Sequence, residues 1–256
     1  PVSATEAPRS EAVAASPSAD AEARFLALVE REWQWRLAQF PQLATGVGVH
    51  DHDDRLGRVD AVAQQERRRY WEGVLAELDR IDIDTLPPAR RIDARIFRDQ
   101  LESSVDNIRL GDWQMPFNAD SSFWSGLTFL PRRQPLATAD DYRRYIRRLE
   151  AVPALFDQYI GVMEAGIARG MTVPRATLGG RDRSIAQLAE GDPEASPFYA
   201  PFKRIPAGVP ADEADALREA GRRVVAEAVQ PAYAKLHVFF RDTYVPNART
   251  TLAAHD

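Results

Sequence analysis

The segment Thr138–Gly170, TADDYRRYIRRLEAVPALFDQYIGVMEAGIARG, contains the local signals that decide the fold. Thr138 with Asp141 three residues later is typical of a capping box at the start of a helix. Pro153 predicts either a kink in one long helix or a boundary between two, and Gly170 suits a helix C-terminus. Apolar residues between these signals recur at the three- and four-residue spacing of one buried helical face: Tyr142, Ile146, Leu149, Leu155, Phe156, Ile160, Met163 and Ile167.

Helical spacing continues over most of the chain from about residue 20, and no stretch alternates like a half-buried strand. The sequence therefore predicts an all-α protein, an irregular array of six or more helices, some kinked at proline. Helices are expected over 20–40, 60–78, 87–110, 138–170, 174–190 and 212–245, the last interrupted or bent at Pro231. In the third of these, the residues expected on the buried face are Ile92, Ile96, Leu101, Val105 and Ile108.

Residues 112–137 have no helical period, yet they carry Trp113, Phe117, Phe123 and Trp124 among prolines. Because exposed aromatic side chains forfeit burial energy and favour association, this segment must pack on something. It either seals the helical layer or lines a binding cleft. Trp124 is the best candidate for a cleft side chain, since indole offers an apolar face and one N–H donor.

Composition divides the 256 residues into a short tail and one helical domain. Residues 1–19 are mostly Ala, Ser, Pro, Glu and Val, which predicts a low-complexity tail that is disordered or extended. Residues 20–256 are long enough to form a large core. The tail is either a vector-derived leader or the linker left after removal of a signal peptide. We favour export to the periplasm or cell envelope, with a cytoplasmic location as the alternative.

Charge and residue usage exclude several classes of protein. The net charge of −5 argues against a nucleic-acid partner. The absence of cysteine excludes disulfides, thiol nucleophiles and thiolate metal sites. No apolar run approaches the roughly 20 residues that a membrane-spanning helix needs.

Two clusters of polar residues resemble functional motifs. His50, His52 and the aspartates of His50–Asp54 are metal-ligand types, but ligands one and two residues apart rarely converge on one ion. An Asp-rich turn is the favoured interpretation. Four arginines on one helical face could bind phosphate, but acidic neighbours at helical spacing favour ion pairs on a solvated face; they are Arg143, Arg144, Arg147 and Arg148. We interpret Arg67–Arg69 in the same way.

Catalytic signatures are missing from the sequence. It contains no G-x-S-x-G elbow, no phosphate-binding G-x-x-x-x-G-K-[ST] loop and no H-E-x-x-H helix. We therefore assign no catalytic residue and no metal ligand, and we expect no cofactor in this chain.

A series of segments in a fixed order points to a known family. The chain resembles the N-terminal half of the bacterial family catalogued as domain of unknown function 885. The segments are Gly48–Leu56, Arg91–Phe97, Tyr145–Leu149 leading to Pro153, Ala165–Gly170 leading to Pro174 and Arg175, Ser196–Tyr199, Val229–Tyr233 and Tyr244–Arg249.

The resemblance implies a longer, helical, often exported protein, sometimes a lipoprotein, similar to gluzincin-type zinc metallopeptidases. A His-Glu-x-x-Pro-Gly-His helix in the C-terminal half would hold zinc and activate water. This chain would wall the substrate cleft, with Trp124 and Arg175 as weak candidates for substrate binding. Its partners would be that C-terminal half and a peptide, and the chain alone is expected to be inactive. The alternative is a non-catalytic helical module that binds or scaffolds partners in the cell envelope.

Overall fold

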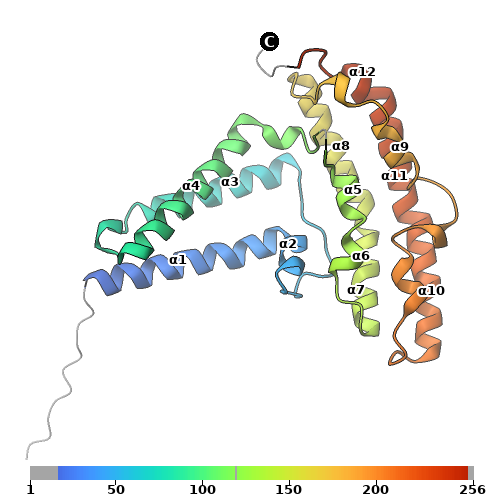
Figure 1. Ribbon diagram of the computed structural model, residues 1–256, viewed down its shortest axis with the longest axis horizontal. Coiled ribbons are helices and arrows are strands. Elements are labelled where there is room, and N and C mark those ends of the chain that lie inside the picture. The colour runs from blue at the N-terminus through green and yellow to red at the C-terminus, as the bar shows by residue number, and fades with distance from the viewer. Residues whose placement is uncertain (1–16, 119, 253–256) are drawn as a thin grey trace, which may run out of the picture.

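Helices make up the regular structure in the computed structural model of the protein, which describes residues 17–118 and 120–252 (Figure 1). The α-helices are α1 (Pro17–Gln39), α2 (Pro41–Gly46), α3 (Ala61–Leu78), α4 (Pro88–Leu110), α5 (Phe123–Leu127), α6 (Leu130–Arg133), α7 (Ala139–Glu150), α8 (Val152–Ala168), α9 (Arg181–Ala186), α10 (Ala211–Val224), α11 (Gln230–Phe239) and α12 (Val245–Asn247). Among the described residues, an isolated antiparallel bridge between Phe117 and Ser122 is the sole β-type pairing. The all-α prediction is confirmed.

The first helix already includes residues 17–19, which the sequence assigned to the tail. The rest of the predicted tail, residues 1–16, lies outside the described residues.

Two separate hydrophobic cores organise the helices. Helices α1, α3 and α4 form the arm at the left of Figure 1 and share a core that includes Phe25, Trp71 and Leu101. Helices α7 and α8 run beside α10 and α11, and their core includes Phe156 and Tyr233. The arm therefore meets the larger helical layer along a junction that neither core fills.

Helix α4 shows both a confirmed boundary and an error in the predicted buried face. Pro88 begins the helix, and Gly111 follows its last residue with a φ of 86°, as expected from the sequence. The buried positions are Ala94, Phe97, Leu101, Val105 and Ile108. Ile92 and Ile96 are 59% and 51% exposed, so their predicted burial is wrong. The face centred on Ala94 and Phe97 packs instead, because small and aromatic side chains there fit against α1 and α3.

Pro153 separates two helices that follow each other closely. Helix α7 ends at Glu150 and α8 begins at Val152, with proline in its first turn. The capping box at the start of α7 is present: Asp141 N–H donates to Thr138 Oγ1 at 3.2 Å, and Thr138 N–H donates to Asp141 Oδ2 at 2.9 Å.

Removing the cap hydroxyl by Thr138→Ala should lower the free energy of unfolding by about 1 kcal/mol, because one N–H at the start of α7 loses its acceptor. Urea denaturation followed by circular dichroism measures the change. Thr138→Ser keeps the hydroxyl and is the matched control. An equal loss in both variants would contradict a capping role.

The helix predicted over residues 174–190 is wrong in most of its length. The structure has a short 3₁₀ turn at Arg175–Thr177 and the six-residue helix α9. Gly180 has a φ of 77°, in the left-handed region that an α-helix does not contain. The consecutive glycines Gly179 and Gly180 thus divide the segment.

The C-terminal helical run is continuous from α10 to α12 and contains two π-helical segments. These segments are Val225–Val229 and Phe240–Tyr244. Pro231 lies just after the first of them, near the start of α11. Proline has no N–H to donate to the preceding turn, and a wider turn accommodates that missing bond within the helix.

Candidate functional site

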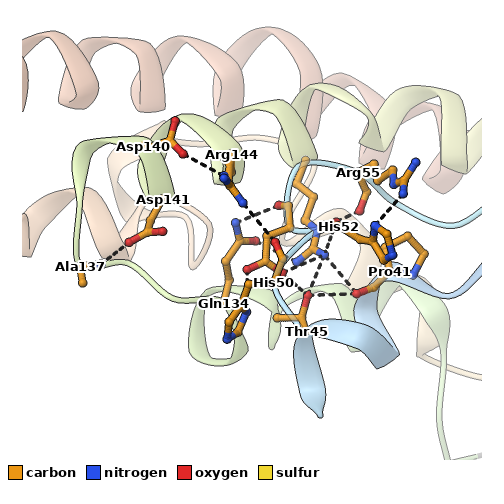
Figure 2. A network of polar contacts seen from close by, with 12 residues as sticks. Pro41, Thr45, His50, His52, Arg55, Gln134, Ala137, Asp140, Asp141 and Arg144 are labelled. Carbon is orange, nitrogen blue, oxygen red and sulfur yellow. Dashed lines mark hydrogen bonds and ion pairs between the residues drawn. The ribbon is translucent and has the colours of Figure 1, made fainter. Parts of the chain in front are cut away.

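The Asp-rich turn 50–54 is held against the helical layer by Arg148 of α7, whose side chain is completely buried. Arg148 donates hydrogen bonds to Gln134 Oε1 at 2.9 Å and to Thr45 Oγ1 at 2.8 Å. Its remaining acceptors are the backbone oxygens of Pro41, His52 and Arg55. Figure 2 shows Pro41, Thr45 and Gln134 facing a common centre. The prediction of a solvated face is therefore wrong for Arg148.

Asp53 supplies the negative charge of this network. It is almost fully buried, and its Oδ1 lies 3.5 Å from Arg148 Nη2 and accepts a hydrogen bond from Thr45. Burial lowers the pKa of Arg148, and the carboxylates of Asp53 and Asp54 offset part of that effect. The arrangement stabilises the junction between α2, the turn and α7, which is a structural role.

The two histidines of the turn do not fit a zinc site. His50 Nδ1 lies 2.9 Å from Asp53 Oδ2, whereas His52 Nδ1 accepts a hydrogen bond from Arg55 at 2.6 Å. Each imidazole is thus paired with a different side chain. Across residues 17–118 and 120–252 no group of three or more His, Cys, Asp or Glu side chains is placed to hold a metal. The structure is consistent with the Asp-rich turn favoured from the sequence.

The remaining arginines of α7 form ion pairs, but only that of Arg144 is with a neighbour at helical spacing, as the sequence predicted; the partners of Arg143 and Arg147 come from elsewhere in the chain. Arg143 pairs with Glu213 at 2.7 Å, Arg144 with Asp140 at 2.9 Å and Arg147 with Asp54 at 3.9 Å; all three arginine side chains are solvent-accessible. Their charges are compensated, so this face provides no uncompensated cationic stripe.

The two substrate-binding candidates lie in different environments. Trp124 on α5 is fully buried, and its Nε1 donates to Ser184 Oγ at 3.0 Å. Arg175 is exposed, and its Nη2 donates to the backbone oxygens of Pro246 and Ala248. The structure thus does not bring them together. Contact of either residue with a substrate stays a prediction.

A cavity of about 470 Å³ lies at the junction between the arm and the larger layer. Its walls come from α1, α3 and α4 on one side and from α8 on the other. Its lining is mixed, and the aromatic and cationic side chains that matter for recognition include Arg36, Arg58, Arg67, Trp71, Trp113 and Tyr159. The volume is within the range of small-molecule and peptide-residue pockets.

Arg67 is the most unusual residue of this cavity. It is 3% exposed, although the sequence predicted a solvated position for Arg67–Arg69. That prediction is wrong for Arg67 because α3 buries the face carrying Ala63, Arg67, Trp71 and Val74. Burial lowers the pKa of Arg67, the carboxylate of Asp60 offsets part of this effect, and the charge of Arg58 adds to it. A guanidinium nevertheless stays charged at neutral pH.

Comparison with known proteins identifies the family. A model of the family described as bacterial protein of unknown function, DUF885, matches residues 41–255. The chain belongs to the DUF885 family. No curated protein matches the chain.

One solved structure similar to this DUF885 chain is "The crystal structure of the putative lipoprotein from Colwellia psychrerythraea". The TM-score is 0.72 at 17% sequence identity, and the match covers 91% of this chain. At that identity the likeness shows a shared fold alone. The chain spans 42% of the length of the Colwellia protein. Within the described part of the DUF885 chain, no helix is long and apolar enough to cross a bilayer.

Proposed function

We propose that this chain is the helical portion of an exported, metallopeptidase-like protein and forms one wall of its substrate cleft. The observation that carries the proposal is the cavity between the arm and α8, with its buried arginine and aromatic walls. Concave sites with apolar walls and a few placed polar groups are typical of ligand-binding regions. The described residues include no metal-binding group, so in this proposal the chain binds the peptide and does not itself hydrolyse it.

In this proposal, zinc and the catalytic side chains belong to a further segment of the parent protein, and this division separates substrate binding from catalysis. Family membership and the match to less than half of the Colwellia protein support this division. Zinc held by a His-Glu-x-x-Pro-Gly-His helix would supply an activated water for peptide hydrolysis. The residues of this chain would bind and orient the peptide. Trp124 and Arg175 stay proposed substrate contacts elsewhere on this chain, since neither lines the cavity.

Export to the periplasm or cell envelope is part of the same proposal. Its support is the tail composition of residues 1–19 and the similarity to a Colwellia protein described as a lipoprotein. Fractionation of cells expressing the parent protein tests it. A purely cytoplasmic parent would contradict the assignment.

The isolated chain should bind no stoichiometric zinc and hydrolyse no peptide, because His50 and His52 are each paired within the turn and no metal group is formed among the described residues. Elemental analysis after dialysis measures the zinc content. The control is the double variant His50→Ala with His52→Ala. One tightly held zinc per chain that disappears in this variant would contradict the prediction.

The parent protein provides the positive test of the proposed function. Incubated with a peptide mixture, it should release fragments detectable by mass spectrometry, and a chelator should abolish their release. Zinc should restore it. A folded parent that cleaves no peptide under these conditions would instead favour the non-catalytic envelope module.

A further inference from the structure

We propose that the cavity between the arm and α8 binds the terminal α-carboxylate of a peptide at Arg67, with the peptide's apolar last residue against the aromatic walls. The peptide nature of the ligand rests on the proposed function. The inference that the ligand carries a carboxylate and an apolar group is drawn from the lining of the cavity itself. This site goes beyond the proposed cleft wall because it names the end of the substrate that is recognised.

The charge balance of the cavity favours an anion. The lining includes Arg36, Arg58 and Arg67 but a single carboxylate, that of exposed Asp112. Arg36 pairs with Glu32 at 2.7 Å and Arg58 pairs with acidic residues of its own segment. Arg67 forms no ion pair with any described residue. The Asp60 carboxylate offsets only part of the effect of burial on the Arg67 charge. A buried cation without an ion-pair partner is costly, and a bound carboxylate would compensate it.

The hydrogen bonds of Arg67 also leave donors for a ligand. Nη2 donates to the backbone oxygens of Arg58 at 2.6 Å and Gln39 at 3.4 Å. Nε is buried and has no acceptor among the described residues. The guanidinium lies 4.4 Å from the centre of the Phe40 ring, which fixes its plane. A guanidinium oriented in this way and still short of acceptors is suited to a carboxylate.

The walls of the cavity fit an apolar side chain next to that carboxylate. Trp71, Trp113 and Leu155 supply apolar surface, and Tyr159 adds a ring from α8. Burial raises the pKa of Tyr159 to about 12, so its hydroxyl keeps its proton at neutral pH and can donate to an anion. The cavity of about 470 Å³ is large enough for one or two residues of a peptide.

Binding of N-acetyl-alanyl-phenylalanine to the chain tests this site without requiring hydrolysis. In a ¹H–¹⁵N NMR titration, the indole N–H signals of Trp71 and Trp113 should shift saturably. The indole signal of Trp124, which does not line the cavity, should keep its chemical shift. The same peptide with a carboxamide end should bind about 10- to 100-fold more weakly, since it lacks the charge for Arg67. An amidated peptide ending in glutamate reports whether a side-chain carboxylate binds instead.

Two variants and a matched control separate binding from folding. Arg67→Gln should weaken binding of the free acid by about 10- to 100-fold and abolish the preference for acid over amide. Arg69→Gln removes an exposed arginine of the same helix and should bind like the wild type. Ser104→Trp keeps Arg67 but fills the cavity, so it should prevent binding. This variant provides the test if Arg67→Gln does not fold.

Several results would overturn the site: no saturable shift, equal affinity for acid and amide, tighter binding of the glutamate peptide, or binding that survives Ser104→Trp. The failures of the two proposals are distinguishable. Absent binding together with zinc-dependent cleavage by the parent contradicts the carboxylate site alone. Carboxylate-selective binding with a parent that cleaves no peptide contradicts the peptidase proposal alone.

Discussion

Arg148→Met is expected to lower the free energy of unfolding by about 3–5 kcal/mol, since it removes one partner of a buried charge pair. The long methionine side chain keeps much of the packing volume. Asp53 would then stay buried without its cation, and Gln134 and Thr45 would each lose a hydrogen-bond donor. Three backbone oxygens lose their donor as well. Urea denaturation monitored by circular dichroism and tryptophan fluorescence measures the change.

Arg147→Met is the matched control, because Arg147 is the adjacent residue of α7 but its side chain is about half exposed. Its 3.9 Å pair with Asp54 should contribute no more than about 0.5 kcal/mol. A double-mutant cycle with Asp53→Asn isolates the buried pair, and the double variant should lose less stability than the two single losses added together. Equal effects at 147 and 148 would contradict the role assigned to Arg148.

Helix positions could be predicted from the sequence where a local signal marks each end. Two boundaries are predicted correctly, the start of α7 by the capping box of Thr138 and Asp141 and the end of α4 by Gly111. These signals depend only on local backbone conformation and local hydrogen bonds. Tertiary packing decides the rest. Ile92 and Ile96 are apolar at helical spacing, yet it is the face of α4 carrying Phe97 that packs in the core of the arm. Periodicity alone does not choose between two adjacent apolar faces.

The candidate site was harder to predict because its main residues carry charge. Arg67 and Arg148 both lie within arginine-rich segments whose acidic neighbours indicate a solvated surface. Their position on the helix did carry a signal for burial. Arg67 lies four residues before buried Trp71, and Arg148 lies three residues after buried Tyr145 and next to buried Leu149. A charged residue in register with a buried aromatic face is itself a candidate for burial. The cavity is lined by residues of α3 and α8, which are far apart in the sequence, and no local pattern indicates that they share a site.

Trp124→Ala is expected to lower the free energy of unfolding by about 3–5 kcal/mol, because it leaves a large cavity in the main core. Trp124 is fully buried, and its ring contacts Phe117 and Phe240 with centroid distances of 5.1 and 5.7 Å. The loss of Nε1–H also leaves Ser184 without that donor. Thermal and urea denaturation of the variant measure the effect.

Two further substitutions distinguish packing from substrate contact at this position. Phe129→Ala removes a ring that is 46% exposed in the same segment, so its effect should stay within about 0.5 kcal/mol. Trp124→Phe retains most of the ring and loses the indole N–H that reaches Ser184. If Trp124 acts through packing, stability should follow the volume removed, and the folded fraction of the parent should bind peptide normally. Weaker peptide binding by Trp124→Phe at unchanged stability would assign the side chain to the cleft, because only a ligand contact would then account for the loss.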